Sequence, residues 1–305
     1  MNLHLLRIFA AVAEHRSFSR AASALFISQP AVSKAVQQLE HQLDLSLIER
    51  GAGGPRGARG VRLTEGGQAL FEHARGIFAL ERAAAEEVRA RVGLQRGRLT
   101  VGASTTIAGY WLPAYAAEFT RQFSAIQLQI RVGNTQAVGQ ALIDCEIDLA
   151  LVEGQLSDPR IVADHWRDDE LQIIAPPHAG PARRRRVPVD ELNAQLWLVR
   201  EPGSGTREVT DCLMRTQGIE PKRTIQFGSN EGIARAVAAG LGVAVLPARV
   251  VRELVRMGEV KALRLSDSRA SALVRPLYLL QLKERPRSPM AREFCALLTR
   301  VLELR

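Results

Sequence analysis

The chain has 305 residues, of which 46% are hydrophobic and 24% charged, the balance of a globular protein with about two domains. Its net charge of +9 favours a polyanionic partner without naming one. Three scattered cysteines, six histidines without metal-site spacing and a polar N-terminus predict a cytoplasmic protein with no disulfide framework, metal, other cofactor or signal peptide. The apolar runs are also too short to span a membrane.

The first 62 residues predict three helices and a loop. Apolar residues recur at helical spacing from Leu3 to Ala13, and Ser17 and Ser28 stand where the N-caps of the second and third helices are expected. Pro30 is compatible with the first turn of the third helix. The Gly- and Arg-rich stretch 51–63 then predicts a loop, and it lacks the Gly-Lys-Ser/Thr sequence of a phosphate-binding loop.

The third helix, expected over residues 28–43, has a polar face that suits duplex DNA. Gln29, Ser33, Lys34 and Gln37 lie opposite its apolar stripe. Gln can pair with adenine, Ser can bond many base edges, and Lys can reach guanine or phosphate. On polar composition alone, an ordinary exposed helix face is the better interpretation, so the assignment depends on a wider pattern.

That pattern extends over some sixty residues. The segments LRIFAAVA at 6–13, SFSRAA at 17–22, SQPAVS at 28–33, LE at 39–40, LIER at 47–50 and LTEGG at 63–67 closely resemble LysR-type transcriptional regulators. The resemblance implies an α/β protein overall: an all-α winged helix-turn-helix (1–63), a long linker helix (64–93) and a two-lobed domain like periplasmic binding proteins (94–305).

The resemblance also implies partners and contacts. The partners are a double-stranded DNA operator, RNA polymerase, a small-molecule effector and further copies of the chain, as a homodimer that assembles into a homotetramer. The residues assigned to DNA are Ser17, Arg20, Ser28, Gln29, Pro30, Ser33, Lys34, Gln37, Arg50 and Arg62. Two features depart from the family pattern: Ile48 replaces the usual Phe, and the wing, which is the loop 50–63, is several residues longer than usual.

Thr64 is expected to cap the long helix that reaches about Val92. Apolar residues recur along it at steps of three and four, namely Phe71, Ala74, Phe78, Ala85, Val88 and Val92. Such a seam favours pairing with a helix of a second subunit. The alternative is a helix that packs on its own domain.

From Arg98 onward, strand and helix patterns alternate, which predicts parallel sheets covered on both faces. Strands are expected at 99–103, 126–132, 147–152, 171–175, 196–200, 224–227, 243–246 and 277–282. Two lobes fit this length better than one. The first is expected over about 98–167 and 271–305, and the second over about 168–270.

Hydroxyl-rich turns follow two of these strands, where ligands of α/β domains bind. Ser104, Thr105 and Thr106 end the first strand, and Ser204, Thr206 and Arg207 follow strand 196–200 in a Gly-rich turn. Hydroxyls and free N–H groups at a helix start suit an anion, whereas simple N-capping needs only one hydroxyl. Arg207 either supplies charge to the ligand or forms a surface ion pair.

Three further residues at strand ends complete the predicted effector site: Thr135, Glu153 and Asn230, although Glu153 suits a solvated turn equally well. The segments GASTTI, VGNT, LVEG and GSGTR resemble a LysR branch that includes regulators of sulfur assimilation and of carbon fixation. That resemblance implies a small anionic effector such as sulfite, sulfate or a phosphorylated metabolite.

Two rival functions use the same scaffold. An enzyme would need chemistry from the carboxylates Asp144, Asp148, Glu153, Asp168, Asp169 and Glu170. No nucleophile, metal or dinucleotide motif accompanies them, and a scatter of surface carboxylates explains them better. A solute-binding protein would need export and would leave the helix-turn-helix unexplained.

Overall fold

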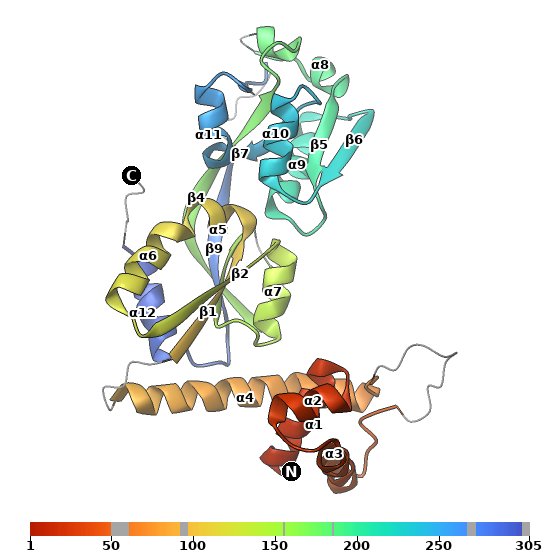
Figure 1. Cartoon of the computed structure of the whole chain (residues 1–305). Coiled ribbons are helices and arrows are strands. Elements are labelled where there is room, and N and C mark those ends of the chain that lie inside the picture. The colour runs from red at the N-terminus through yellow and green to blue at the C-terminus, as the bar shows by residue number, and fades with distance from the viewer. Residues whose placement is uncertain (50–60, 92–96, 155, 185, 267–272, 301–305) are drawn as a thin grey trace. The chain divides into compact units, whose positions relative to one another are not determined.

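The structure is a computed structural model (Figure 1). It describes residues 1–49, 61–91, 97–154, 156–184, 186–266 and 273–300. The chain divides into two compact units, Met1–Ala85 and Glu86–Arg305. Within the part of the chain that the structure describes, no helix is both long and apolar enough to cross a membrane.

Three helices form the start of the N-terminal unit: α1 (Leu3–His15), α2 (Phe18–Leu25) and α3 (Gln29–Leu43). Their apolar faces share one core that includes Phe9, Val32 and Leu39. The Oγ atoms of Ser17 and Ser28 accept hydrogen bonds from the backbone N–H groups three residues later, at 3.3 and 3.4 Å. These bonds satisfy N–H groups that have no partner inside a helix, and so they fix where α2 and α3 begin.

A short antiparallel bridge between Ile48 and Leu63 closes the base of the wing. The buried Glu40 carboxylate supports it by accepting hydrogen bonds from the backbone N–H groups of Leu47 (2.8 Å) and Ile48 (3.2 Å). The N–H of Glu49 donates to the carbonyl of residue 62 at 3.1 Å. The predicted wing contact Arg50 and the loop to residue 60 lie outside the described residues.

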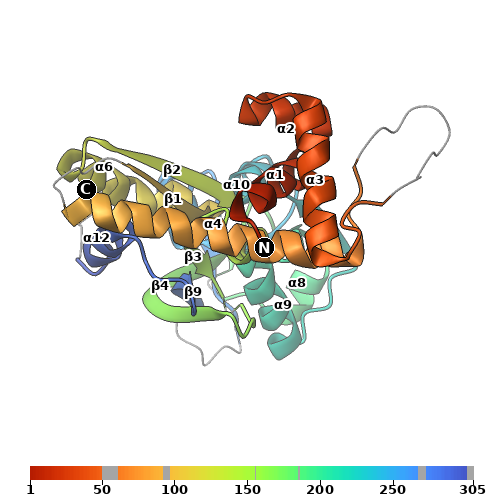
Figure 2. The same cartoon turned by 90° about the horizontal axis from the view of Figure 1, so that it is seen from below.

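The long helix α4 (Glu65–Arg91) is shown along its length in Figure 2. It begins, as predicted, where the Thr64 hydroxyl accepts a hydrogen bond from the Gly67 N–H at 3.0 Å. Gly67 is required there, because a Cβ at this position would lie 2.0 Å from the carbonyl oxygen of Leu47. Part of the predicted intersubunit seam packs on its own unit instead. Ala74 is fully buried in the N-terminal core, and Phe71 and Phe78 pack against it.

The C-terminal unit contains nine strands: β1 (Gly97–Ser104), β2 (Ile126–Gly133), β3 (Leu149–Glu153), β4 (Ile161–Ala175), β5 (Leu196–Arg200), β6 (Arg223–Phe227), β7 (Ala244–Pro247), β8 (Lys261–Leu263) and β9 (Leu273–Leu282), counted over the described residues. The helices that follow β1 in the chain are α5 (Thr105–Tyr110), α6 (Leu112–Gln122), α7 (Thr135–Ile143), η1 (Pro181–Arg183), α8 (Val189–Asn193), α9 (Gly205–Gln217), α10 (Asn230–Ala238), α11 (Ala248–Arg256) and α12 (Pro289–Leu298).

The sheets are mixed, which corrects the prediction of parallel sheets. Strands β2, β1 and β3 pair in parallel, as do β5 and β6. In contrast, β9 pairs antiparallel with both β3 and β4, and β4 pairs antiparallel with β7 and β8. The antiparallel pairs arise because β4 and β9 are single long strands shared by both lobes, whereas strand-helix alternation predicts only the crossover units around them.

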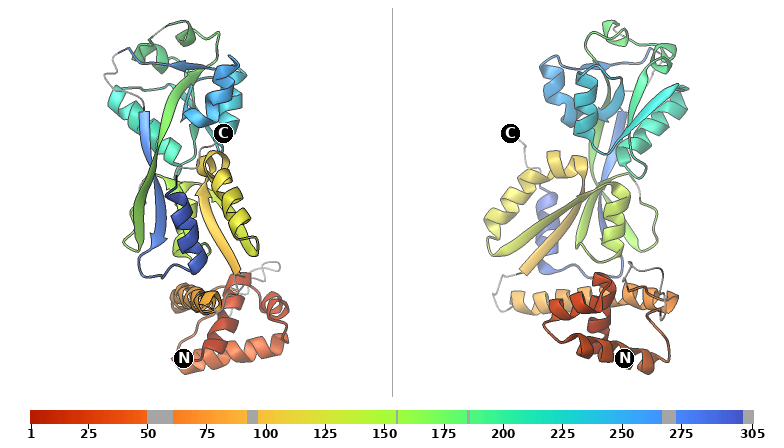
Figure 3. Two further views of the ribbon diagram at one scale, coloured as in Figure 1. Left: turned by 90° about the vertical axis from the view of Figure 1, so that its left-hand side faces the viewer. Right: turned by 45° about the vertical axis from the view of Figure 1, so that its right-hand side comes forward.

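Two lobes result, and β4 and β9 connect them side by side (Figure 3). In the first lobe, α5, α6 and α12 cover one core around Leu99, Tyr115 and Phe294, and α7 covers the other face of the sheet. In the second lobe, separate cores form around Trp197 and around Val251. This arrangement brings the ends of β1, β3 and β5 together between the lobes.

Candidate DNA-binding and effector-binding sites

Most of the DNA contacts predicted on α3 lie on its exposed face. Gln29, Pro30, Lys34 and Gln37 are exposed, and Ser33 is half-buried. The apolar side of the same helix, with Val32, Val36 and Leu39, is buried in the core. Because the core holds α3 firmly along one side, its polar side chains project from a rigid support, which a reading helix for the major groove requires.

The other predicted DNA residues lie near the start of α2 and at the wing base. Arg20 and Arg62 are exposed. Ser17 and Ser28 are engaged as helix caps, so their hydroxyls have a structural role whether or not DNA is bound. Phe26, between α2 and α3, has 95% of its surface exposed.

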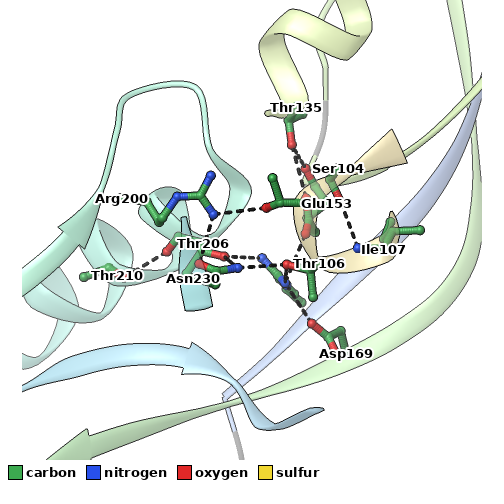
Figure 4. A network of polar contacts seen from close by, with 12 residues as sticks. Ser104, Thr106, Ile107, Thr135, Glu153, Asp169, Arg200, Thr206, Thr210 and Asn230 are labelled. Carbon is green, nitrogen blue, oxygen red and sulfur yellow. Dashed lines mark hydrogen bonds and ion pairs between the residues drawn. The ribbon is translucent and has the colours of Figure 1, made fainter. Parts of the chain in front are cut away.

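In the first lobe, the three predicted hydroxyl residues have different environments. Ser104 is buried and caps α5, since its Oγ accepts a hydrogen bond from the Ile107 N–H at 3.3 Å. Thr105 is half-buried and Thr106 is buried. Both threonines face the second lobe: Thr105 accepts a hydrogen bond from Arg200 at 3.2 Å, and Thr106 accepts one from Asn230 at 3.0 Å (Figure 4).

The Gly-rich turn after β5 in the second lobe faces the same polar side chains. Ser204 and Thr206 are buried at the start of α9, and the Ser204 side chain makes no capping hydrogen bond. Thr206 accepts hydrogen bonds from Asn230 at 3.4 Å and from Arg275 at 3.0 Å. Arg207 instead bonds Asp211 at 2.8 Å and the carbonyl of residue 200 at 3.0 Å, which is the surface ion-pair alternative.

Glu153 is buried rather than solvated. The Thr135 hydroxyl donates to the Glu153 carbonyl at 2.9 Å, and one carboxylate oxygen of Glu153 lies 3.2 Å from Arg275. Gly205 allows the close approach, because a Cβ on Gly205 would lie 2.6 Å from the Cβ of Glu153. The Gly-rich turn therefore lets the two lobes approach each other, as well as leaving N–H groups at the start of α9.

Two buried arginines that the sequence analysis missed lie at the centre of this site. Arg200, the last residue of β5, bonds Thr105, Asn230 (3.0 Å) and both carboxylate oxygens of Glu201 (2.8 Å each). Arg275, on β9, bonds Thr106 (3.3 Å), Thr206 and Asp169 (2.8 Å). Each guanidinium thus connects residues of both lobes.

Burial and charge affect the acidic groups here. Burial raises the pKa of Asp169, and Arg275 opposes that shift. Burial also raises the pKa of Glu208 on α9, and the nearby Glu153 carboxylate adds to it. Asp169 and Glu153 are 2% and 3% exposed, so the expectation that they are scattered surface carboxylates is wrong.

The arginines were missed because each belongs to a strand that is otherwise largely apolar. Arg200 ends the apolar segment LWLV, and Arg275 lies between Val274 and Pro276. A charged residue within an apolar strand is the signal that would have identified both, since buried charges are rare unless paired. Chemically, the site offers guanidinium, hydroxyl and amide donors at the starts of α5, α9 and α10, a set that suits oxygen acceptors.

Two protein-family models match the chain. "Bacterial regulatory helix-turn-helix protein, lysR family" matches residues 3–68, and "LysR substrate binding domain" matches residues 93–303. Together they cover both units.

Individual relatives agree with these models. The HTH-type transcriptional regulator CysL of Bacillus subtilis is 30% identical over 88% of this chain and 87% of that protein. The RuBisCO operon transcriptional regulator of Allochromatium vinosum is 34% identical over 81% and 79%. The regulatory domain of Synechocystis PCC6803 CcmR, solved in complex with 2-PG, matches with a TM-score of 0.61 and 25% identity over 67% of this chain and 96% of that one.

Proposed function

Because the chain belongs to the LysR family of transcriptional regulators, we propose that a small oxyanion bound between its C-terminal lobes controls how its N-terminal helices occupy operator DNA. The family assignment makes the chain a DNA-binding regulator with an effector-binding domain, and its relatives are regulators rather than enzymes. The branch with CysL and the RuBisCO regulators is the one expected from the sequence.

On DNA, α3 enters the major groove and presents Gln29, Ser33, Lys34 and Gln37 to base edges. Arg20 and Arg62 contact phosphates. The capping residues Ser17 and Ser28, together with Pro30, place the first turns of α2 and α3 against the DNA backbone. Arg50 joins the wing contacts. The exposed polar face of α3 opposite a buried apolar face is the observation that supports this assignment.

The assignment of an oxyanion as the ligand is supported by five side chains that converge between the lobes, namely Arg200, Arg275, Thr106, Thr206 and Asn230. Each threonine hydroxyl accepts two hydrogen bonds and also carries an O–H that can donate to a ligand oxygen. Two helix N-termini, those of α9 and α10, add dipoles of the same sign. The CcmR complex with 2-PG gives a ligand precedent in a related domain.

Replacing Arg200 by methionine is expected to weaken oxyanion binding at least tenfold. Methionine keeps much of the apolar volume but removes every charge-assisted hydrogen bond, each of which contributes about 1.5–3 kcal/mol. The matched control is Arg207→Met, because Arg207 faces Asp211 instead of the site. Isothermal titration of both full-length variants with sulfate, sulfite and phosphate decides the matter. Equal losses in the two variants, or none, would contradict the assignment.

Cleft closure around the anion changes the angle between the lobes and so the spacing of reading heads along DNA. LysR regulators act as oligomers, and we assign the dimer contact to the exposed part of α4. Leu80 and Val88 have exposed fractions of 49% and 64%, and they lie eight residues apart on one helix face. Assembly into a tetramer, contact with RNA polymerase and a cytoplasmic location complete the proposal.

Leu80→Glu is expected to convert the dimer into monomers, because it places a charge in an apolar helix-helix contact. Leu80 is a better test position than Phe78, because Arg7 stacks 4.3 Å from the Phe78 ring inside the N-terminal unit. The control is Arg82→Glu, which changes charge at an exposed position of the same helix. Sedimentation that shows the same oligomer for a folded Leu80→Glu variant would refute the contact.

A further inference from the structure

The arginines of the inter-lobe site are already neutralised by carboxylates. Arg200 forms two hydrogen bonds with Glu201, both at 2.8 Å. Arg275 lies 2.8 Å from Asp169 and 3.2 Å from Glu153. Arg200, Arg275, Glu153 and Asp169 are all at least 97% buried, so solvent screens their charges weakly. An anion that enters this site therefore meets paired guanidinium groups rather than free ones.

Two further charged groups face this cluster from the second lobe. Glu208, on α9, lies close to Glu153 and to Gly154. Arg249, on α11, faces Asp169 and stacks 3.7 Å from the Trp111 ring. The four buried groups, Arg200, Arg275, Glu153 and Asp169, carry two positive and two negative charges when fully ionised. The buried part of the cluster therefore has no net charge.

We propose that the oxyanion binds to this site together with a proton, which the carboxyl group of Asp169 or Glu208 takes up from solvent. The inference rests on the proposed effector site and adds a requirement to it. A negative ligand in a poorly solvated cluster without excess positive charge is repelled by the nearest carboxylates. Protonation of one of them removes a negative charge and gives an O–H donor that can bond the ligand oxygen.

The direction of the pH effect follows from linkage. Burial already raises the pKa of Asp169 and of Glu208, and a bound anion raises it further. The complex therefore holds more protons than the free protein at neutral pH. Affinity then rises as the pH falls, by up to about tenfold per pH unit for one proton, and levels off below the pKa of the free protein.

Titration calorimetry of the full-length protein with sulfate tests this, because sulfate keeps its charge through the neutral range. The heats are measured at about pH 6 and about pH 8 in buffers with different heats of ionisation, which gives the number of protons exchanged. We expect uptake of about one proton and an affinity that is higher at the lower pH. Binding with no proton uptake and equal affinities would overturn the inference while leaving the effector site intact.

Carboxyl variants locate the proton. Asp169→Asn and Glu208→Gln each leave one amide that cannot ionise, and we expect proton uptake to fall sharply in one of them. Glu208 is exposed as a residue although its carboxyl group is partly desolvated beside Glu153, so we expect its variant to fold even if the buried Asp169→Asn does not. The control is Glu146→Gln, at an exposed ion pair with Arg131. Unchanged uptake in folded forms of both site variants would overturn the assignment, and no binding of sulfate, sulfite or phosphate would overturn the effector site itself.

Discussion

Replacement of Arg275 by methionine will destabilise the C-terminal unit by about 3–5 kcal/mol, the usual cost of breaking a buried ion pair from one side. The guanidinium lies between the buried carboxylates Asp169 and Glu153, and it also bonds Thr106 and Thr206. Without it, two buried carboxylates lose their cation. At roughly 2–4 °C per kcal/mol, the melting temperature falls by roughly 6–20 °C.

Calorimetric unfolding of the full-length protein measures the effect. The control is Arg131→Met, which breaks the exposed pair with Glu146 and should cost at most about 1 kcal/mol. The double variant Arg275→Met/Asp169→Asn should recover part of the loss, because it removes one unpaired charge. A melting temperature of Arg275→Met that matches the control would show that this network contributes little to stability.

The same variant should show a pH dependence of known sign. Burial raises the pKa of Asp169 above its value in the unfolded chain, so the folded state binds more protons. Such a group favours folding on the acid side, and that contribution is lost as the pH rises. Arg275 lowers that pKa, so removing it raises the pKa of Asp169 further in the variant. The stability deficit of Arg275→Met relative to wild type should therefore narrow when the pH is lowered from about 7 towards 5.

Gln29→Ala is expected to weaken operator binding by about 1–3 kcal/mol and to relax preference at one base pair. Gln29 is exposed in the first turn of α3, where side chains of a reading helix meet base edges, and its removal leaves the core intact. Wild-type binding should weaken with salt at a log–log slope of about −5 to −9, as expected for ~6–10 phosphate contacts.

The matched control is Gln42→Ala, which removes an exposed glutamine from the last turn of the same helix. It should leave both affinity and sequence preference unchanged. Fluorescence anisotropy with the operator and with single-base variants of it gives both quantities. Identical affinity and base preference in wild type and Gln29→Ala would remove Gln29 from the reading face.

Much of the N-terminal unit could be predicted from sequence because its signals are local. Three kinds of signal depend only on neighbours in the chain. They are serines that cap the N–H three residues later, apolar residues at helical spacing, and Thr64 directly before α4. The packing partner of the apolar seam on α4 could not be determined from the sequence. Phe78 packs on α1 of its own unit, and one helix pattern does not distinguish that partner from a second subunit.

The candidate effector site could be predicted only in part, because some of its residues follow a strand directly in the chain and others do not. The two hydroxyl turns follow strands, so Thr106 and Thr206 could be found from the chain order. Arg275 could not, because it reaches the site through the antiparallel pairing of β9 with β4, between segments about a hundred residues apart. Arg207 was favoured over Arg200 because sequence shows proximity to the turn but not the direction of the side chain.

The most direct test of the central claim is operator binding by wild type and Arg200→Met, with and without the oxyanion that calorimetry identifies. The account predicts that the anion changes the operator affinity of the wild type by about 5–150-fold, the range of ordinary coupling energies, or shifts its footprint on the operator. Arg200→Met should bind the operator like the anion-free wild type and show no response, whereas Arg207→Met should respond normally. An undiminished response in Arg200→Met would contradict sensing through this inter-lobe site.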